Sequence, residues 1–234
     1  MKLALIGYGA MNSMVGTLAR QEDHEVALAL TSKDAARSVE ELSERLAGHD
    51  AAIDFSVAGA VLANIEACAR AGVPLIEGTT GWREDEERAR KLVEEHNGAL
   101  VYGANFSIGV NLFYRIISYA AGLFRATEIY TPFIEEAHHS RKRDAPSGTA
   151  LRLRDLVSEH FDAHEISVAS TRAGHIPGTH RVGFDSAADQ ILLTHEARSR
   201  EGFAAGALLA ARWIVGRKGV YEFSQVIDDI LRKG

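Results

Sequence analysis

Cysteine and proline are scarce in this chain, and each scarcity narrows the range of possible structures. The 234 residues include one cysteine, Cys68, and four prolines. A single thiol cannot form a disulfide within the chain, and Cys68 lies in an apolar helical pattern where a buried, unreactive thiol is expected. The remaining composition, with 46% hydrophobic and 25% charged residues, is that of an ordinary globular protein with a sizeable core.

Long hydrophobic runs and an excess of positive charge are also absent from the sequence. No apolar stretch approaches the roughly 20 residues that span a membrane, so we expect no membrane association. The chain starts directly with a strand-like run, residues 2–6, and lacks a signal-peptide pattern, which favours a cytoplasmic protein. The formal net charge of −6 argues against a nucleic-acid partner, although the basic run at residues 141–143 could still bind a small anion.

Strand-like and helix-like segments alternate through the first hundred residues. Apolar runs that predict strands occupy residues 2–6, 25–30, 51–56, 73–77 and 99–102, and helical patterns lie between most of them. Strands that alternate with helices at this spacing predict an α/β fold with a Rossmann-type, doubly wound parallel sheet, whose ligands bind at the carboxyl ends of the strands. Four loops lie at such ends and are expected to converge on one crevice, at residues 7–9, 31–33, 78–80 and 103–105.

The loop after the first strand carries a glycine pattern typical of nucleotide binding. Gly7-Tyr8-Gly9 joins the strand to a helical pattern, and glycines at such a turn let the backbone approach a pyrophosphate at the helix N-terminus. Asn12 replaces the third glycine of the usual fingerprint and puts a side chain where helix and strand normally pack closely. The truncated fingerprint indicates a dinucleotide site only in combination with the other loops.

The second strand ends in Thr31-Ser32-Lys33, which bears on the choice of cofactor. Proteins that bind NAD usually place a carboxylate here on the ribose hydroxyls, whereas hydroxyl and cationic side chains suit the 2′-phosphate of NADP. No carboxylate occurs before Asp34, so we expect NADPH in preference to NADH, with Ser32 and Lys33 at the phosphate. A solvated turn is the alternative interpretation of these residues.

The pattern changes after residue 107. A long helical segment is followed, further along, by three strand-like runs without helices between them, at residues 165–172, 180–186 and 189–198. Consecutive strands predict a second, α+β domain with a mixed, mostly open-faced sheet, and an open face commonly becomes an oligomer interface. The last two helical segments are expected to return to the first domain. We predict a dinucleotide-binding domain of residues 1–104 and 204–234, and a substrate-binding and oligomerisation domain of residues 105–203.

One short run, residues 135–149, concentrates the groups that a proton-transfer site requires. An apolar approach within residues 129–134 predicts a strand, and the loop that leaves it carries two adjacent histidines, His138 and His139, followed by Lys142. Histidine has the side-chain pKa nearest neutral pH, and lysine adds a cationic proton donor. A metal site is the alternative, but neighbouring histidines on an extended chain point in different directions, and no cysteine or H-E-x-x-H spacing accompanies them. We therefore expect no metal.

The same run ends at the start of a helix. Pro146 disfavours helix before it, Ser147 is a good N-cap, and apolar residues recur at helical spacing beyond them. The first turn carries the N–H groups of Gly148 and Thr149 at the positive end of the helix dipole, which can hold a carboxylate or phosphate. The run is therefore predicted to hold an anion and to move a proton.

The run from Glu136 to Ala150 reads Glu-Ala-His-His-x-x-Lys-x-Asp-Ala-Pro-Ser-Gly-Thr-Ala, and it closely resembles the signature of the 4-hydroxy-tetrahydrodipicolinate reductase family of bacterial lysine and diaminopimelate synthesis. The resemblance extends along the chain, at residues 7–11, 53–56, 78–81, 104–111, 178–180, 199–200 and 203–207. It implies an NAD(P)H-dependent oxidoreductase that reduces 4-hydroxy-tetrahydrodipicolinate, a cyclic imine dicarboxylate, to tetrahydrodipicolinate. It also implies a homotetramer in which the sheets of the second domains pack together.

The resemblance further implies a role for each residue of the predicted site. His138 would be the acid/base histidine and Lys142 the proton-donating lysine. The groups that would hold the substrate carboxylates are His139, Ser147, Gly148 and Thr149. Family members accept NADH, NADPH or both, and the residues that would contact the nucleotide are Gly7, Tyr8, Gly9, Ala10, Met11, Asn12, Gly78, Thr79, Thr80, Gly103, Ala104, Asn105 and Phe106.

Two other functions fit parts of the sequence. A different two-domain dehydrogenase, acting on an amino or hydroxy acid, would share the nucleotide loops and would ignore the cyclic imine. A nucleotide-sensing regulatory module would bind the cofactor tightly without turnover, but it has no evident need for His138, Lys142 and the helix start at Ser147. The reductase is therefore the interpretation that accounts for most of the motifs in the chain.

Overall fold

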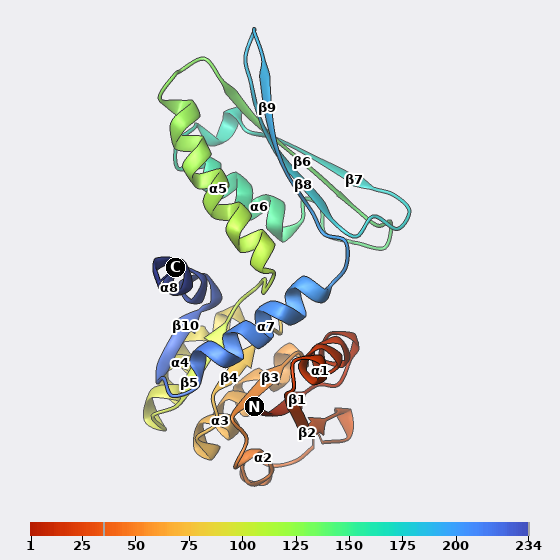
Figure 1. Ribbon diagram of the computed structural model, residues 1–234, viewed down its shortest axis with the longest axis vertical. Coiled ribbons are helices and arrows are strands. Elements are labelled where there is room, and N and C mark those ends of the chain that lie inside the picture. The colour runs from red at the N-terminus through yellow and green to blue at the C-terminus, as the bar shows by residue number, and fades with distance from the viewer. Residues whose placement is uncertain (35, 234) are drawn as a thin grey trace. The chain divides into compact units, whose positions relative to one another are not determined.

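The computed structural model describes residues 1–34 and 36–233, and the chain folds into two compact units. The first unit contains residues 1–108 and the chain from residue 200 onward, and the second contains residues 109–199. Each unit has its own sheet (Figure 1). Each also has its own hydrophobic core. No helix among the described residues has the length and apolar character needed to cross a membrane.

The first unit is built on a six-stranded parallel sheet with the order β10-β5-β4-β3-β1-β2. Its strands are β1 (Lys2–Ile6), β2 (Glu25–Leu30), β3 (Ala51–Asp54), β4 (Leu75–Glu77), β5 (Ala99–Tyr102) and β10 (Gly219–Glu222). Runs of consecutive buried apolar residues, as in β1, are typical of parallel strands that are covered on both faces. The predicted Rossmann-type sheet is confirmed.

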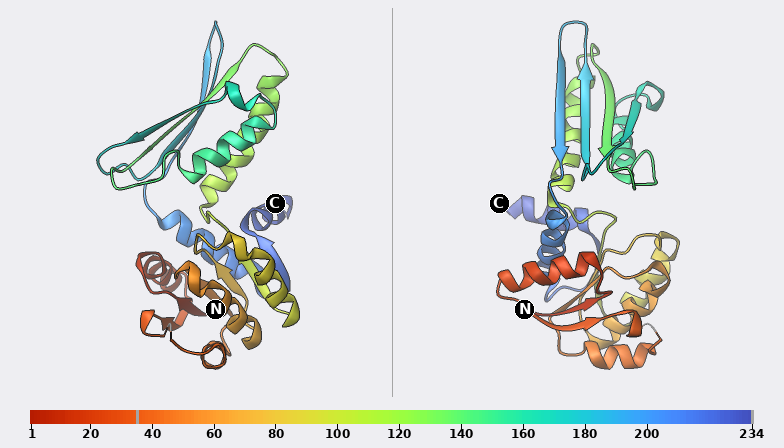
Figure 2. Two further views of the ribbon diagram at one scale, coloured as in Figure 1. Left: turned by 180° about the vertical axis from the view of Figure 1, so that it is seen from behind. Right: turned by 90° about the vertical axis from the view of Figure 1, so that its right-hand side faces the viewer.

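Helices cover both faces of this sheet (Figure 2). One face carries α2 (Val39–Leu46), α3 (Val61–Ala71) and α4 (Glu86–Glu95), which contribute Leu46, Ile65 and Val93 to a core shared with the central strands. On the other face, α1 (Ala10–Gln21) packs against α7 (Glu201–Ile214), which also crosses β3, β4 and β5. The last helix, α8 (Phe223–Lys233), follows β10 directly.

The register of the sheet aligns the carboxyl ends of neighbouring strands. Ile6 of β1 pairs with Asp54 of β3, which in turn pairs with Glu77 of β4. Glu77 pairs with Tyr102, the last residue of β5. The loops that follow these strands consequently leave the sheet along one edge, which is where doubly wound sheets bind their ligands.

The second unit holds a four-stranded mixed sheet with the order β7-β6-β8-β9. β6 (Thr131–His138) pairs in parallel with β7 (Ser167–Arg172) and antiparallel with β8 (Thr179–Asp185), and β8 pairs antiparallel with β9 (Gln190–Glu196). The helices α5 (Ile108–Arg125) and α6 (Gly148–Ser158) lie on one side of this sheet only (Figure 1, Figure 2). The predicted mixed, open-faced sheet is confirmed.

Side chains alternate between the two faces of β6. Ile134 joins the core under α5 and α6, and Glu136 and His138 follow it on the same face at intervals of two residues. Phe133 and Glu135 point to the face that the helices leave uncovered. The charged and titratable residues of the signature therefore enter the interior of the second unit.

The structure differs from the sequence-based expectations in three places. The sequence did not predict α2, which Ser38 and Glu41 start with a reciprocal capping box, or the four-residue strand β10. It also placed both histidines in a loop, whereas β6 runs on to His138. The strand extends that far because its ladder with β7 continues to the pair of His138 with Arg172.

Candidate active site

The loops predicted to bind a nucleotide lie along the carboxyl edge of the parallel sheet. Residues 7–9 connect β1 to α1, and Ala10, Met11 and Asn12 form the first turn of that helix. Gly7 has φ +78°, and a Cβ there would lie 2.6 Å from the Cα of Ser56, so only glycine fits. Gly9, the N-cap of α1, has open space around it, which leaves the helix N-terminus accessible to a phosphate.

Asn12, which stands where the fingerprint has its third glycine, turns its side chain into the sheet. Its Nδ2 donates hydrogen bonds to the carbonyl oxygens of Ile6 (2.7 Å), Gly7 (3.1 Å) and Ile53 (3.2 Å). The side chain is fully buried and does not reach the surface where a phosphate would bind. A contact between this residue and the nucleotide would therefore come from its backbone.

A buried pair of carboxyl groups, Asp54 and Glu77, holds the loops that follow β3 and β4. The N–H of Ser56 donates to Asp54 Oδ1 (2.7 Å), and the N–H of Thr79 donates to Glu77 Oε1 (2.7 Å). Burial, followed by the charge of Asp54, raises the pKa of Glu77 to about 10, and burial also raises the pKa of Asp54. The pair therefore shares a proton at neutral pH. Residues 78–80 are anchored at their start by this pair, and Thr80 is exposed.

Asp34 organises the loop after β2, where the sequence predicts the 2′-phosphate site. Its carboxylate accepts hydrogen bonds from the N–H of Thr31 (3.0 Å) and from Arg37 (2.9 Å), and it also pairs with Arg45. These contacts, that with Thr31 first, hold the pKa of Asp34 well below its usual range. The predicted phosphate ligands beside this carboxylate are both exposed, at Ser32 and Lys33.

The fourth loop predicted to bind the nucleotide, residues 103–106, joins β5 to α5 and is anchored by an aromatic ring. Phe106 is buried against Phe223, with ring centroids 4.7 Å apart. Asn105 accepts a hydrogen bond from the N–H of Ser107 at its Oδ1 (2.9 Å), and Ala104 is exposed. The packing fixes the path of the loop and leaves its outer residues at the sheet edge.

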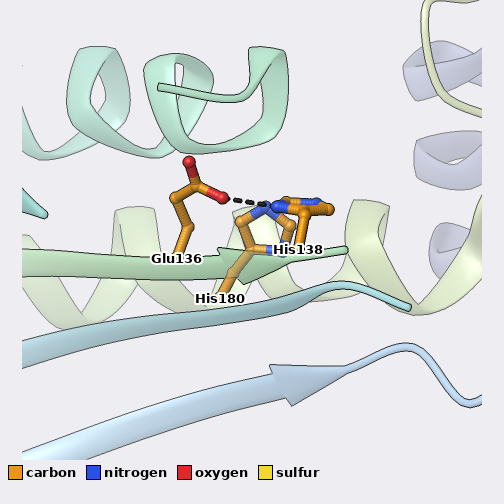
Figure 3. Close-up of side chains that lie close together, drawn as sticks. All are labelled: Glu136, His138 and His180. Carbon is orange, nitrogen blue, oxygen red and sulfur yellow. Dashed lines mark hydrogen bonds and ion pairs between the residues drawn. The ribbon is translucent and has the colours of Figure 1, made fainter. Parts of the chain in front are cut away.

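In the second unit, His138 is held from two sides. The Glu136 carboxylate, through Oε2, hydrogen-bonds to Nδ1 of His138, two residues further along the same strand (Figure 3). The ring of His180, from β8, meets the ring of His138 edge-on, with centroids 5.1 Å apart. All three side chains are buried on the face of the sheet that the helices cover.

Arg172, the last residue of β7, neutralises Glu136. Its Nη1 and Nη2 donate to the two carboxylate oxygens at 2.9 and 2.6 Å, and the N–H of Ser147 donates to Oε1 at 3.3 Å. Burial would raise the pKa of Glu136, but hydrogen bonds from Arg172, Ser170 and His138 outweigh it and lower the value to about 2. Glu136 is therefore ionised at neutral pH.

His138, one of the two residues predicted to move protons, is affected by the charge of the other, Lys142. Burial lowers the pKa of His138, and the Glu136 carboxylate partly restores it. The positive charges of Lys142 and Arg172 lower the pKa further. Lys142 lies in the loop after β6 and forms an ion pair with Asp144 (2.8 Å). The free protein consequently holds His138 neutral at pH 7, beside a lysine that is ion-paired.

Helix α6 begins where the sequence predicts, with Ser147 as its N-cap. The Oγ of Ser147 accepts a hydrogen bond from the N–H of Ala150 (3.2 Å) and lies 3.1 Å from Nε2 of His180. Burial, together with the charge of His138 in its protonated form, lowers the pKa of His180 to about 4, so its ring is neutral at pH 7. The helix start and the two histidine rings are thus joined into one network through Ser147 and Glu136.

The other predicted substrate groups lie around this helix start. Gly148 is exposed, with open space where a side chain would be, and Thr149 hydrogen-bonds through its side chain to Tyr114 of α5. His139 is half-buried, and among the described residues its buried Nδ1 has no hydrogen-bond partner. A buried polar atom left without a protein partner is available to a ligand.

Sequence reasoning assigned no role to four residues of this cluster, namely Glu136, Arg172, Gly178 and His180. Glu136 lies two residues before His138, a spacing that places two side chains on one face of a strand. Gly178 and His180 belong to a short motif within the family resemblance. Arg172 lies 36 residues after Glu136 and carried no local signal.

Glu136, His138 and His180 each offer one ligand atom within 4.8 Å of the others, a spacing that a metal ion could use. Both oxygens of Glu136 already accept hydrogen bonds from Arg172, so a cation would have to sit beside a guanidinium. Repulsion between like charges at such a distance opposes metal binding. We interpret these residues as a hydrogen-bonded network around His138.

Comparison with known proteins places this site in a family. The profile described as "Dihydrodipicolinate reductase, N-terminus" matches residues 1–106, and that described as "Dihydrodipicolinate reductase, C-terminus" matches residues 109–227. A 4-hydroxy-tetrahydrodipicolinate reductase of Christiangramia forsetii is 35% identical, with 99% of this chain and 100% of the relative covered. That of Methanosarcina barkeri is 39% identical, with 78% of this chain and 73% of the relative covered.

A solved structure has the same fold. The dipicolinate-bound dihydrodipicolinate reductase from Paenisporosarcina sp. TG-14 superposes with a TM-score of 0.77 at 20% identity, covering 95% of this chain and 97% of that one. The resemblance found in the sequence is confirmed by the profiles and by the full-length relative. Because the two profiles together cover nearly all of the sequence, the chain belongs to the dihydrodipicolinate reductase family.

Proposed function

We propose that this chain reduces 4-hydroxy-tetrahydrodipicolinate to tetrahydrodipicolinate with a pyridine nucleotide, as a step of diaminopimelate and lysine synthesis. The observation that carries the proposal is the cluster at the start of α6, where His138, held by Glu136, and Lys142 accompany a helix N-terminus. Family membership and the full-length relative from Christiangramia support the reaction.

The second unit offers anion-binding groups that suit a ring with two carboxylates. The relative from Paenisporosarcina was solved with dipicolinate bound, which supports a small dicarboxylate ligand here. We assign the carboxylates to the first-turn amides of α6, at Gly148 and Thr149, and to His139 and Ser147. The positive end of the helix dipole favours an anion at the amides. Nδ1 of His139, which has no hydrogen-bond partner in the described part of the chain, supplies a further polar contact.

His138 and Lys142 manage the protons in this proposal. When bound, a pyridine nucleotide would supply a hydride to the conjugated ring that remains after the ring hydroxyl is lost as water, and the ring then takes up one proton. Because Glu136 accepts the hydrogen bond from Nδ1 of His138, the opposite ring nitrogen is the one that exchanges a proton with the substrate. The charge of Lys142 lowers the pKa of His138, which makes a proton on that ring easier to release, and Lys142 itself can donate a proton.

The first unit would hold the nucleotide at the carboxyl edge of its sheet. The open N-terminus of α1 behind Gly9 suits the pyrophosphate. We propose a preference for NADPH over NADH because Lys33 is exposed beside the loop and because Asp34, the nearest carboxylate, is already engaged by Arg37 and Arg45. A carboxylate held by two arginines is a poor acceptor for ribose hydroxyls.

We also propose a homotetramer built on the uncovered face of the second sheet. On that face Phe133, Gly183 and Leu192 form a row across β6, β8 and β9. A Cβ at Gly183 would lie 2.2 Å from the Phe133 ring, so the ring lies flat across the strand, and Leu192 is exposed next to it. An apolar row on an open sheet face is suited to packing against a second sheet.

The assay that tests the reductase uses purified protein, NADPH and enzymatically generated substrate, and it should show oxidation of the nucleotide. The variants His138→Gln and Lys142→Ala should each lower kcat by about 100-fold or more, with nucleotide affinity unchanged, since general acid–base groups contribute at this level. The matched controls are His96→Gln and Lys91→Ala, which change exposed residues of the first unit.

Two results would contradict the proposal. Full activity in both site variants would refute the assigned roles. Oxidation of an amino or hydroxy acid, together with no reaction of the cyclic imine, would favour a different dehydrogenase. Titration of NADPH and NADH by fluorescence, with and without pyridine-2,6-dicarboxylate as a substrate mimic, measures the cofactor preference separately.

A further inference from the structure

The contacts around His138 make its two ring nitrogens unequal. Glu136 is ionised and can only accept hydrogen bonds, so Nδ1 of His138, which contacts Glu136 Oε2, must carry the hydrogen of the neutral ring. The other nitrogen, Nε2, is then the one that can take up a proton. Which nitrogen does so in a histidine is set by the hydrogen bond that the opposite nitrogen makes.

Arg172 holds the Glu136 carboxylate in a single orientation. Its two terminal nitrogens donate hydrogen bonds to both carboxylate oxygens. The same nitrogens also donate to the carbonyl oxygens of Thr171 (2.8 Å) and Asp144 (2.6 Å). The parallel ladder of β6 and β7 places Arg172 opposite His138, so its position is fixed by the sheet. A carboxylate bound at both oxygens cannot rotate away from the imidazole.

Gly178, just before β8, leaves the approach to Nε2 open. A Cβ at this position would lie 3.2 Å from Nε2 and 3.3 Å from Cδ2 of His138. The residue also has φ +149°, a conformation that favours glycine. Any larger residue would therefore place a side chain against the nitrogen that Glu136 leaves free.

We propose that Glu136 and Arg172 are a positioning pair that locks His138 in its Nδ1–H tautomer, and that Gly178 keeps Nε2 open for proton exchange with the substrate. The identity of that substrate rests on the proposed function, whereas the tautomer lock is a property of the free protein. Glu136 and Arg172 act through His138 and touch no reacting atom.

The ring-nitrogen chemical shifts of protein labelled with nitrogen-15 histidine test the lock without substrate. Spectra recorded at a pH above the pKa of His138 should show this ring protonated at Nδ1 and unprotonated at Nε2. The signals are assigned by their loss in His138→Gln. A neutral His138 that carries its hydrogen on Nε2 would overturn the proposal, whatever the activity of the protein.

The double variant Glu136→Gln/Arg172→Gln tests the pair in catalysis, because it removes both charges and leaves neither one buried alone. It should lower kcat by about 10- to 100-fold with nucleotide affinity unchanged, which is the usual effect of losing a group that orients a histidine. The nitrogen-15 spectrum of the double variant should also show the Nε2–H form of His138. The acidic limb of the kcat profile should move to lower pH, because the Glu136 carboxylate raises the pKa of His138 by more than the charge of Arg172 lowers it.

Glu135→Gln is the matched control, since Glu135 is the preceding residue on the strand and pairs with Arg181 at 3.6 Å on the opposite face. It should leave the tautomer, kcat and pH profile unchanged. Glu136→Asp, which keeps the charge, should restore part of the activity that the double variant loses.

The outcomes separate this inference from the proposed function. If the double variant keeps the wild-type tautomer and a kcat within about twofold of wild type, the positioning role is wrong. If the double variant does not fold, the wild-type spectrum and the activity of Glu136→Asp still decide whether the pair positions His138. If the wild-type tautomer is as expected but the cyclic imine is not reduced, the proposed function fails and the lock stands.

Discussion

Asn12 shows how a single polar residue can occupy a position that nucleotide fingerprints reserve for glycine. Its side chain lies under the end of the sheet and donates to carbonyl oxygens of β1 and β3. The carbonyl groups that it bonds lie at or next to the carboxyl ends of these two neighbouring strands. The first turn of α1 is therefore tied to the sheet by hydrogen bonds in place of close packing.

Asn12→Gly should lower the free energy of unfolding by about 2 kcal/mol, through lost hydrogen bonds and the poorer helix propensity of glycine. Nucleotide affinity should stay within about threefold of wild type, because the buried side chain does not face the ligand. Urea unfolding and nucleotide titration measure the two effects. Ser13→Gly changes the next, exposed position of the helix and controls for helix propensity alone. An equal loss of stability in both variants would refute the role of the Asn12 side-chain amide.

Glu77 makes stability depend on pH in the direction opposite to an ion-paired carboxylate. Its pKa is about 10 in the folded chain and 4.5 for an unperturbed glutamate. Its contribution to stability is therefore fully present below pH 4.5 and is lost progressively as the pH rises toward 10. Glutamine reproduces the hydrogen bonds of a protonated glutamate without titrating. Glutamine at this position should therefore abolish the loss of stability at rising pH.

Glu77→Gln should accordingly be more stable than wild type by about 1 to 3 kcal/mol near pH 8, with the difference shrinking toward acid pH. Urea unfolding across the pH range measures the difference. Glu94→Gln, which changes an exposed residue of α4, is the control. Parallel pH profiles for wild type and Glu77→Gln would show that the pair is ionised in the folded protein.

At the scale of the elements, helix α6 connects stability to the site through its N-cap residue, Ser147. Ser147→Ala removes the N-cap bond to Ala150 and the contact with His180. It should lower stability by about 1 kcal/mol, as loss of a cap does, and it should also raise the KM of the dicarboxylate substrate. Thermal unfolding and steady-state kinetics measure the two effects.

Ser38→Ala is the matched control for that helix start, since Ser38 caps α2 in the first unit. It should cause a similar loss of stability with no change in substrate KM. A Ser147→Ala enzyme with wild-type KM would show that the cap serves the fold alone.

Most elements with local signals could be predicted from the sequence, although α2 was missed despite its capping box, and contacts made by strand pairing could not be predicted. The parallel sheet and the start of α6 follow from apolar runs, a glycine turn and the Pro-Ser step. Arg172 and His180 reach the signature histidine only because β7 and β8 flank β6, and no pattern within a strand encodes its neighbours. The short strand β10 was missed for the same reason, since its four residues become a strand by pairing with β5.

At the scale of the whole molecule, the uncovered sheet face of the second unit determines the expected assembly. Leu192→Arg places a charge in the apolar row on that face and should weaken association by about tenfold or more. Sedimentation velocity across a range of concentrations would show smaller species than in wild type. Leu123→Arg, on the exposed side of α5, should leave the assembly intact. A wild-type protein that sediments as a monomer would refute the tetramer.

The two places where the chain crosses between units lie next to each other within the first unit. A side chain on Gly202 would come within 3.7 Å of Ser107 Oγ, and one on Gly206 would collide with the carbonyl oxygen of Phe106. A linker of a few residues should therefore be able to replace the second unit. The first unit, with its parallel sheet, would then be a separate protein. We therefore expect that the inserted unit could be exchanged for another domain while the first unit keeps its fold.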